Sequence, residues 1–149
     1  MDPSLGRRLY LGQRAFADEL DRRLHEQDAS IWNWVLLKEA ATADGASQRE
    51  LANLMRIEPS TLVRHLDKLA EDGLVERRSD PHDRRVARVV VTDAGRSRLE
   101  QLHKVVHELD DELRSVLTAR EIDVLGKALN RIHAYFTSER ESPQKGGGQ

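Results

Sequence analysis

The sequence predicts a mainly α-helical protein with one small β-hairpin. Apolar residues recur at spacings of three and four along most of the 149 residues, as expected of helices that bury one face. Between residues 74 and 92 the pattern changes, because valines gather there around the polar stretch SDPHD, which is typical of two strands and a turn. We therefore expect four helices, a hairpin and two further helices, in that order.

Composition limits the class of protein. The chain is 38% apolar and 34% charged, has a net charge of −2 and contains no cysteine. These values are typical of a globular chain of about one domain and exclude disulfides, thiol chemistry and Cys-ligated zinc. No stretch approaches the roughly 18 apolar residues of a membrane span, and the start MDPSLGRRLY lacks the apolar block of a signal peptide. We expect a cytoplasmic protein without a membrane partner.

The sequence also lacks the motifs of common enzyme sites. There is no glycine-rich loop for a phosphate, no HExxH pair and no motif that presents a serine near a histidine. We expect neither enzymatic activity nor a cofactor.

The first two predicted helices cover residues of about 4–26 and 30–43. In the first, Gln13 falls within an apolar stripe. The stripe consists of Leu5, Leu9, Phe16, Leu20 and Leu24. The second helix opens at Ser30, a favourable N-cap, and is apolar on a wide face that includes Trp32. We expect this second helix to be buried on most sides.

Two shorter helices follow. Ser47 and Glu50 form a capping box, and the helix that they open is expected to present Leu51 and Leu54 to a core. Pro59 suits the first position of the next helix, which has a polar side opposite its buried stripe. That stripe consists of Leu62, Leu66, Leu69 and Ala70.

Positive charge is concentrated in the predicted hairpin. Residues 77–88 carry five arginines against two aspartates, a local charge of +3 in a chain whose net charge is −2. The arginines are Arg77, Arg78, Arg84, Arg85 and Arg88, and the aspartates are Asp80 and Asp83. A compact basic spot on an otherwise acidic protein predicts a small contact surface for an anion.

The last two helices have the apolar spacing of helices that pair with other helices. Thr92 caps the first of them, and Thr118 and Glu121 form a capping box that opens the second. Their seams consist of Leu99, Leu102, Val106, Leu109, Leu113 and Val116, and of Ile122, Leu125, Leu129, Ile132 and Phe136. Such seams predict dimerisation. We expect residues 1–29 and 93–140 to form a helical dimerisation region, 30–92 a separate lobe, and 141–149 a disordered tail.

Two short helices followed directly by a basic hairpin are typical of a winged helix-turn-helix, which predicts double-stranded DNA as a partner. The second helix can enter the major groove, where Arg64 and His65 are long enough to reach base edges. Ser60 and Thr61 in its first turn can contact phosphates or bases, and Lys68 can contact a phosphate. Arginines of the hairpin tip can reach an adjacent groove.

The sequence resembles the multiple-antibiotic-resistance regulator (MarR) family of bacterial repressors. The stretches PSTLVRHLDKLAEDGLVER at 59–77 and DPHDRRVARVVVTDAG at 80–95 resemble the recognition helix and wing of that family. Asp83, Arg84 and Arg85 match its Asp-x-Arg wing motif. The resemblance implies that Arg85 enters the minor groove, that Asp83 orients it, and that the protein is an obligate two-fold dimer.

The resemblance also implies regulation by a small, often aromatic ligand that binds between the dimerisation helices and the DNA-binding lobe. A buried amide of Gln13 facing the indole of Trp32 could orient such a planar ligand. In the alternative interpretation, Gln13 is a polar group of the dimer interface and Trp32 a core residue.

A histidine pair leaves a second kind of regulation open. His103 and His107 stand four residues apart on one predicted helix, a spacing that can place two imidazoles on one metal ion. Both lie beside the apolar seam of this helix, where solvent-exposed residues are expected. Further metal ligands would have to come from His25, Glu26 or another subunit. We assign no metal site.

The sequence therefore predicts a ligand-responsive transcriptional repressor that binds a near-palindromic operator as a homodimer. Two alternatives remain at this point. One is a metal-responsive regulator of the same fold, and the other is a winged-helix module that binds protein instead of DNA.

Overall fold

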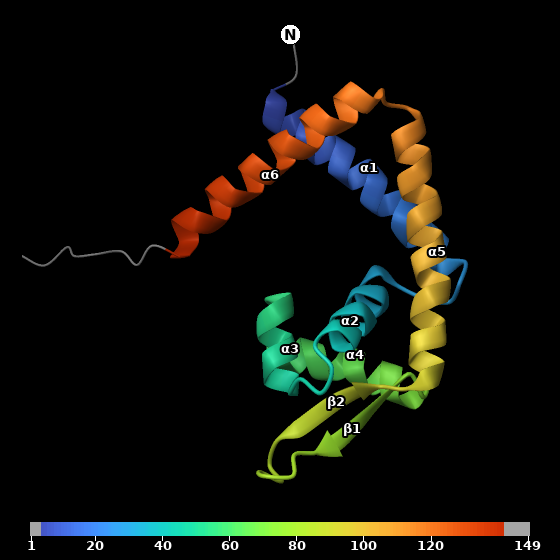
Figure 1. Cartoon of the computed structure of the whole chain (residues 1–149), viewed down its shortest axis with the longest axis vertical. Helices are drawn as coiled ribbons and strands as arrows, with labels where there is room; N and C mark the ends of the chain where they lie inside the picture. The colour runs from blue at the N-terminus through green and yellow to red at the C-terminus, as the bar shows by residue number, and fades with distance from the viewer. Residues whose placement is uncertain (1–3, 142–149) are drawn as a thin grey trace, which may run out of the picture. The chain divides into compact units, whose positions relative to one another are not determined.

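The computed structural model describes residues 4–141 as six helices and one antiparallel hairpin (Figure 1). The elements are α1 (Leu5–His25), α2 (Ile31–Thr42), α3 (Gln48–Met55), α4 (Pro59–Glu71), β1 (Val75–Ser79), β2 (Ala87–Val91), α5 (Asp93–Ser115) and α6 (Ala119–Glu141). The expected order and fold class are confirmed. Residue 141 ends α6, and the rest of the predicted disordered tail, 142–149, lies outside the described residues.

The chain divides into two compact units within α5, Met1–Glu108 and Leu109–Gln149. The first unit contains α1 to α4, the hairpin and most of α5, and the second contains the end of α5 and α6. This is a division by packing. The division by function, with dimerisation at 1–29 and 93–140 and a separate lobe at 30–92, stays a prediction.

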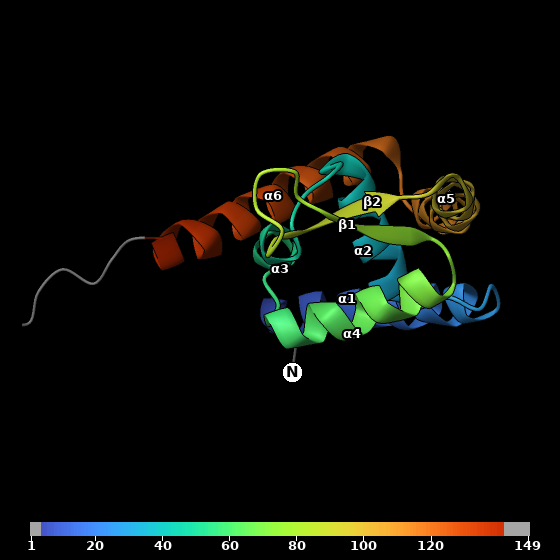
Figure 2. The same cartoon turned by 90° about the horizontal axis from the view of Figure 1, so that it is seen from below.

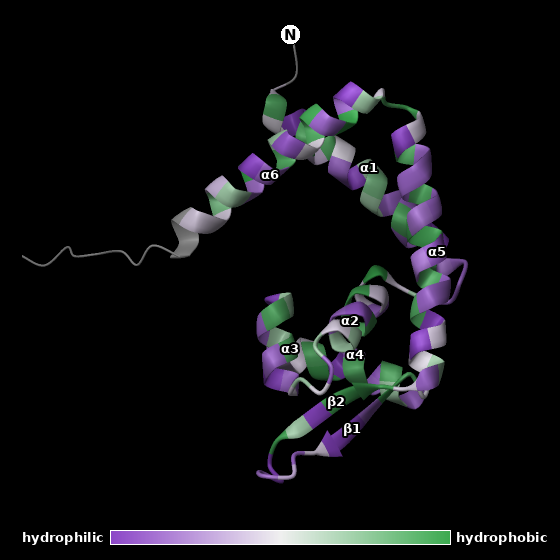
Figure 3. Ribbon diagram, viewed as in Figure 1, coloured by the Kyte–Doolittle hydropathy of each residue, from purple (hydrophilic) through white to green (hydrophobic). Residues whose placement is uncertain are grey.

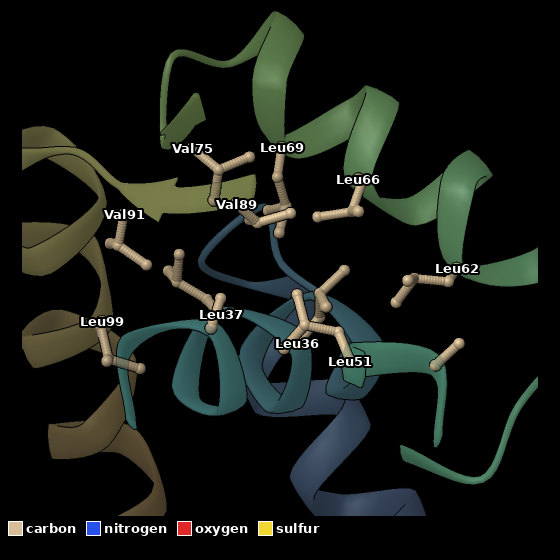
Figure 4. Packing of buried hydrophobic residues seen from close by; sticks show 12 residues of the cluster. Leu36, Leu37, Leu51, Leu62, Leu66, Leu69, Val75, Val89, Val91 and Leu99 are labelled. Atoms are coloured by element: carbon tan, nitrogen blue, oxygen red, sulfur yellow. The ribbon is translucent and has the colours of Figure 1, made fainter. Parts of the chain in front are cut away.

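The hydrophobic core of the first unit lies where α2, α3, α4, the hairpin and the start of α5 meet (Figure 4). Its buried members are Leu36, Leu37, Ala40, Leu51, Ala52, Leu62, Leu66, Leu69, Val75, Val89, Val91 and Leu99. Full burial of a leucine side chain stabilises a fold by about 1.5–3 kcal/mol. The leucines of α4 all point into this core, so packing determines which side of α4 faces solvent.

Two expectations about this core are wrong. Leu54 is 58% exposed, and Trp32 is 45% exposed although α2 was expected to be buried on most sides. The short α3 buries Leu51 and Ala52 and packs the partly buried Met55 against the core. Because residues on a helix are about 100° apart, a face centred on those three leaves Leu54 on the solvent side.

The two hairpin strands have different surroundings. Val75 pairs with Val91 at the base, and Ser79 pairs with Ala87 near the tip. β1 is exposed after its first residue, whereas β2 carries the buried Val89, and Figure 3 shows the polar β1 beside the more apolar β2. The backbone N–H of Val89 also donates to the carbonyl of Ala46 at 2.9 Å. The base of the hairpin is therefore joined to the segment between α2 and α3.

Several apolar side chains stay exposed on α1 and, in the second unit, on the end of α5, just after it and on α6. On α1 they are Leu5, Leu9, Tyr10 and Leu11; in the second unit they are Leu113, Val116, Val124, Leu125, Leu129, Tyr135 and Phe136. Figure 3 shows that polar and apolar residues alternate along α1, α5 and α6. Within residues 4–141, none of the helices has the length and apolar character needed to cross a membrane.

Candidate nucleic-acid interface

Helix α4 presents a polar face to solvent. Because Leu62, Leu66 and Leu69 are buried on one side, Arg64 and Lys68 lie on the opposite side and are exposed. Two hydroxyl residues lie in its first turn, Ser60 exposed and Thr61 partly buried. Figure 2 shows α4 and the hairpin beside each other. The polar face and the hairpin can therefore contact the same extended ligand.

His65 lies at the edge of this face and stacks on Trp32 of α2. The ring centroids are 5.6 Å apart, and the planes are inclined by 21°. Burial lowers the pKa of His65 below its usual value, and the neighbouring positive charge of Arg64 lowers it further. Both effects favour the neutral imidazole, and the stack connects α2 to the middle of α4.

Gln13 and Trp32 do not form the expected pair of a buried amide and an indole. Gln13 is exposed, and it precedes the end of α1 at His25 by roughly 18 Å of helix. Trp32 is the second residue of α2 and lies against His65. The helical periodicity placed each residue on an apolar stripe, but it could not show how far apart the stripes lie.

Arginines on the strands are neutralised within the protein. The Arg77 guanidinium lies 2.7 Å from the Asp67 carboxylate and donates to the Gln48 side chain at 2.6 Å. Arg78 pairs with Glu76 at 2.9 Å. Arg77 therefore links β1 to α3 and α4, and the local charge of the hairpin overstates the cationic surface available to a ligand.

The wing tip begins at Asp80, which is only 8% exposed. Its carboxylate accepts a hydrogen bond from Arg88 Nε at 2.7 Å and from the backbone N–H groups of His82 and Asp83 at 2.7 and 3.1 Å. These bonds, that from Arg88 foremost, lower the pKa of Asp80 to about 2. The sequence interpretation counted Asp80 only as a negative charge. The dipeptide Asp80-Pro81 was the available signal, because such pairs favour turns.

Arg84 and Arg85 are the exposed cations at the tip. Arg85 is 91% exposed, and its Nε donates to Asp83 Oδ1 at 3.2 Å, as does its backbone N–H at 3.0 Å. Arg84 makes no hydrogen bond or ion pair with the residues that the structure describes. The contact of Arg85 with Asp83 agrees with the orienting role that the family resemblance implies.

The histidine pair on α5 lies against an aromatic residue. The His103 ring is 6.3 Å from the Trp34 ring, edge to face, and 6.3 Å from the His107 ring. Among the described residues, no group of three or more His, Cys, Asp or Glu side chains is placed to hold a metal ion.

The arrangement of α3, a short turn, α4 and a hairpin wing defines a winged helix-turn-helix protein. Residues 30–87 match the sequence model of the MarR family. The matched residues occupy most of the lobe expected at residues 30–92.

Known proteins extend this similarity beyond the domain. The HTH-type transcriptional regulator BilQ of Clostridium symbiosum is 36% identical over 88 residues, which are 59% of this chain and 61% of BilQ. The apo form of wild-type MarR from E. coli has 28% identity and a TM-score of 0.78 over 89% of this chain and 98% of that one. A mutant MarR from E. coli complexed with operator DNA has 29% identity and a TM-score of 0.76, over 86% and 92% of the two chains.

Proposed function

We propose that the protein is a transcriptional repressor that binds a near-palindromic DNA operator as a homodimer and releases it when a small organic ligand binds. The observation that carries the proposal is the exposed polar face of α4 beside a wing tip with two exposed arginines. BilQ, a regulator, and E. coli MarR, solved with operator DNA, support it. The surface offers cations and hydroxyls, as a polyanion requires.

Helix and wing have different tasks in this proposal. The outer face of α4 enters the major groove, where Arg64 reads a base edge and Lys68 contacts a phosphate. Ser60 and Thr61 bind phosphate or bases at the helix N-terminus, where the helix dipole favours an anion. His65 contacts DNA from the edge of this face while it stacks on Trp32.

Arg64→Ala is expected to cost specificity on the order of 1–3 kcal/mol at the base pair that Arg64 reads. Lys68→Ala should weaken binding to all DNA sequences about equally, because a phosphate contact carries no sequence information. Selection of duplexes from a random library, followed by titration of matched and mismatched sites, measures both effects. If both variants lose affinity with unchanged sequence preference, α4 is not the reading helix.

Wild-type binding must weaken as salt rises, because phosphate contacts release counterions. A protein that neither binds any selected duplex nor is retained on heparin would instead support the alternative of a winged-helix module that binds protein.

The proposed homodimer is supported by the apolar side chains that α1 and α6 leave exposed. Leu5 is 76% and Phe136 60% exposed, and the 3-4 spacing of their helices suits pairing with other helices. A two-fold dimer places two copies of α4 about one helical turn, or roughly 10 bp, apart on the operator. Sedimentation equilibrium at micromolar concentration should show a dimer, and a monomer there would contradict the proposal.

A cavity of about 320 Å³ offers a place for the effector. Its walls include Lys68 and Arg98, the carboxylates of Asp28 and Asp72, and apolar side chains such as Leu37. Lys68 lies 3.1 Å from Asp72, so a small acid with an apolar body would take the place of that carboxylate at Lys68. Lys68 also belongs to the outer face of α4. A ligand that holds Lys68 in the cavity would bind the DNA-free protein more tightly than the DNA-bound one, which is the condition for release. A thermal-shift screen of the protein with small aromatic acids and with divalent metal ions distinguishes this effector from the metal alternative, because only the true effector should raise the melting temperature.

A further inference from the structure

A continuous series of hydrogen bonds runs from helix α3 to the tip of the wing. It starts at Glu50, whose carboxylate accepts the backbone N–H of Ser47 at 2.6 Å as part of the capping box. The same carboxylate oxygen lies 3.2 Å from Arg88 Nη1. The capping box therefore holds Glu50 in place for the wing as well as for α3.

Arg88 is the central residue of the series. Its Nε donates to Asp80 at 2.7 Å, and its Nη1 donates to the carbonyl of Gly45 at 3.3 Å and to Glu50. The backbone of Arg88 also forms a β-bridge with Ser47. One arginine thus joins the wing tip, the segment before α3, and α3, and its charge-assisted bonds are directed inward instead of toward a DNA phosphate.

Asp80 continues the series into the tip. One carboxylate oxygen accepts from Arg88, and the other accepts the backbone N–H groups of His82 and Asp83. Asp83 in turn binds both the backbone N–H and the Nε of Arg85. The direction of the exposed Arg85 side chain is therefore set through four side chains, of which Glu50 belongs to the helix-turn-helix.

We infer that Asp80 and Arg88 are positioning residues for the wing, which hold its tip so that Arg84 and Arg85 face DNA. The inference rests on the proposed DNA binding and deepens it. Few other bonds order the tip: Asp80 N–H donates to the Val86 carbonyl at 3.0 Å, and Val86 N–H donates to the Asp83 carbonyl at 2.9 Å. A tip held in advance loses less conformational entropy when it binds DNA than a mobile tip.

The sign of one substitution separates positioning from charge. Asp80→Asn removes a negative charge close to the DNA-facing tip, so a purely electrostatic role predicts tighter binding. Positioning predicts weaker binding, by about tenfold, since the loss of a charge-assisted contact costs on that scale. The slope of log affinity against log salt should also fall by roughly 1.8 if one phosphate contact is lost from each wing of a dimer. A variant that only lowers the fraction of folded molecules leaves that slope unchanged.

Glu76→Gln is the matched control. It removes the same charge from the same hairpin, but Glu76 is exposed on β1 and pairs with Arg78, away from the series. Its duplex affinity should equal or exceed that of the wild type. Arg88→Gln should reproduce the loss of Asp80→Asn, and the double variant should lose little more, because both changes break one bond. Arg88→Lys keeps the charge and should recover part of the affinity.

Limited trypsin digestion tests the tip without DNA. Cleavage after Arg84 and Arg85 should be faster in Asp80→Asn than in the wild type and unchanged in Glu76→Gln, at a temperature where circular dichroism shows every variant folded. If Asp80→Asn does not fold, Arg88→Lys takes its place in both measurements.

Different results would contradict the proposed DNA binding and the positioning role of Asp80 and Arg88. A wild-type protein that binds no duplex contradicts the proposed function, and the trypsin result then still decides whether Asp80 and Arg88 hold the tip. A wild type that binds duplex, with an Asp80→Asn variant that binds as tightly as Glu76→Gln, overturns the positioning role. Unchanged trypsin cleavage in Asp80→Asn overturns it as well.

Discussion

Gly95→Ala is expected to destabilise the protein by on the order of 3 kcal/mol, because the site has no room for a methyl group. A Cβ at Gly95 would lie 2.0 Å from the Leu74 carbonyl oxygen and 2.7 Å from Val91 Cγ1. The backbone cannot simply move away. The Gly95 N–H donates to Thr92 Oγ1 at 3.0 Å, and the Thr92 N–H donates to that same Leu74 carbonyl at 3.1 Å.

Urea unfolding of the wild type and of two glycine variants measures this effect. Gly126→Ala in α6 is the matched control, since a Cβ there meets nothing within 4 Å. Alanine is favoured over glycine inside a helix by about 1 kcal/mol, so the control should be slightly more stable than the wild type. A Gly95→Ala variant as stable as the control would show that the first turn of α5 does not approach Leu74 this closely.

Arg85→Ala is expected to reduce DNA affinity and its dependence on salt. Each neutralised phosphate contributes about −0.9 to the slope of log affinity against log salt, so the loss of one contact from each wing of a dimer lowers the slope by roughly 1.8. Insertion into a narrow minor groove predicts a further effect, a larger loss for sites with A·T-rich flanks than for G·C-rich ones. Fluorescence anisotropy with both kinds of duplex over a salt series measures both effects.

Arg78→Ala is the control for Arg85→Ala, because it removes an arginine from the same hairpin that is already paired with Glu76. Arg78→Ala should change the slope of log affinity against log salt less than Arg85→Ala does. Asp83→Ala should lose part of the affinity even though it removes a negative charge, since Asp83 holds Arg85 through two hydrogen bonds. Tighter binding by Asp83→Ala would mean that its charge acts only by repulsion.

Local sequence was sufficient for the helices and their ends. The capping boxes at Ser47 and Thr118 are present, and Pro59 is the first residue of α4. These features were predictable because the interacting groups are three or four residues apart. The buried stripe of α4 was also largely correct, since a regular helix with three leucines on one side has one plausible inner face.

The candidate site was less predictable, because its polar contacts join distant residues. Arg77 reaches Gln48, 29 positions earlier, and Arg88 reaches Glu50 and Gly45, 38 and 43 positions earlier. A count of charges included both arginines in the basic spot that was expected to contact an anion. Packing of α3 against the hairpin instead directs them to partners within the protein, where their charge no longer serves an external anion.

The periodicity of this chain was thus enough to determine the kinds of element, their order and the polar face of α4, because each depends on neighbours within one or two turns. Which arginines stay free, where Asp80 is buried and which ring covers His65 depended on how the elements pack. Those outcomes follow from contacts between segments brought together by a shared leucine and valine core. No local sequence pattern shows which polar groups this apolar packing will bring within hydrogen-bond distance.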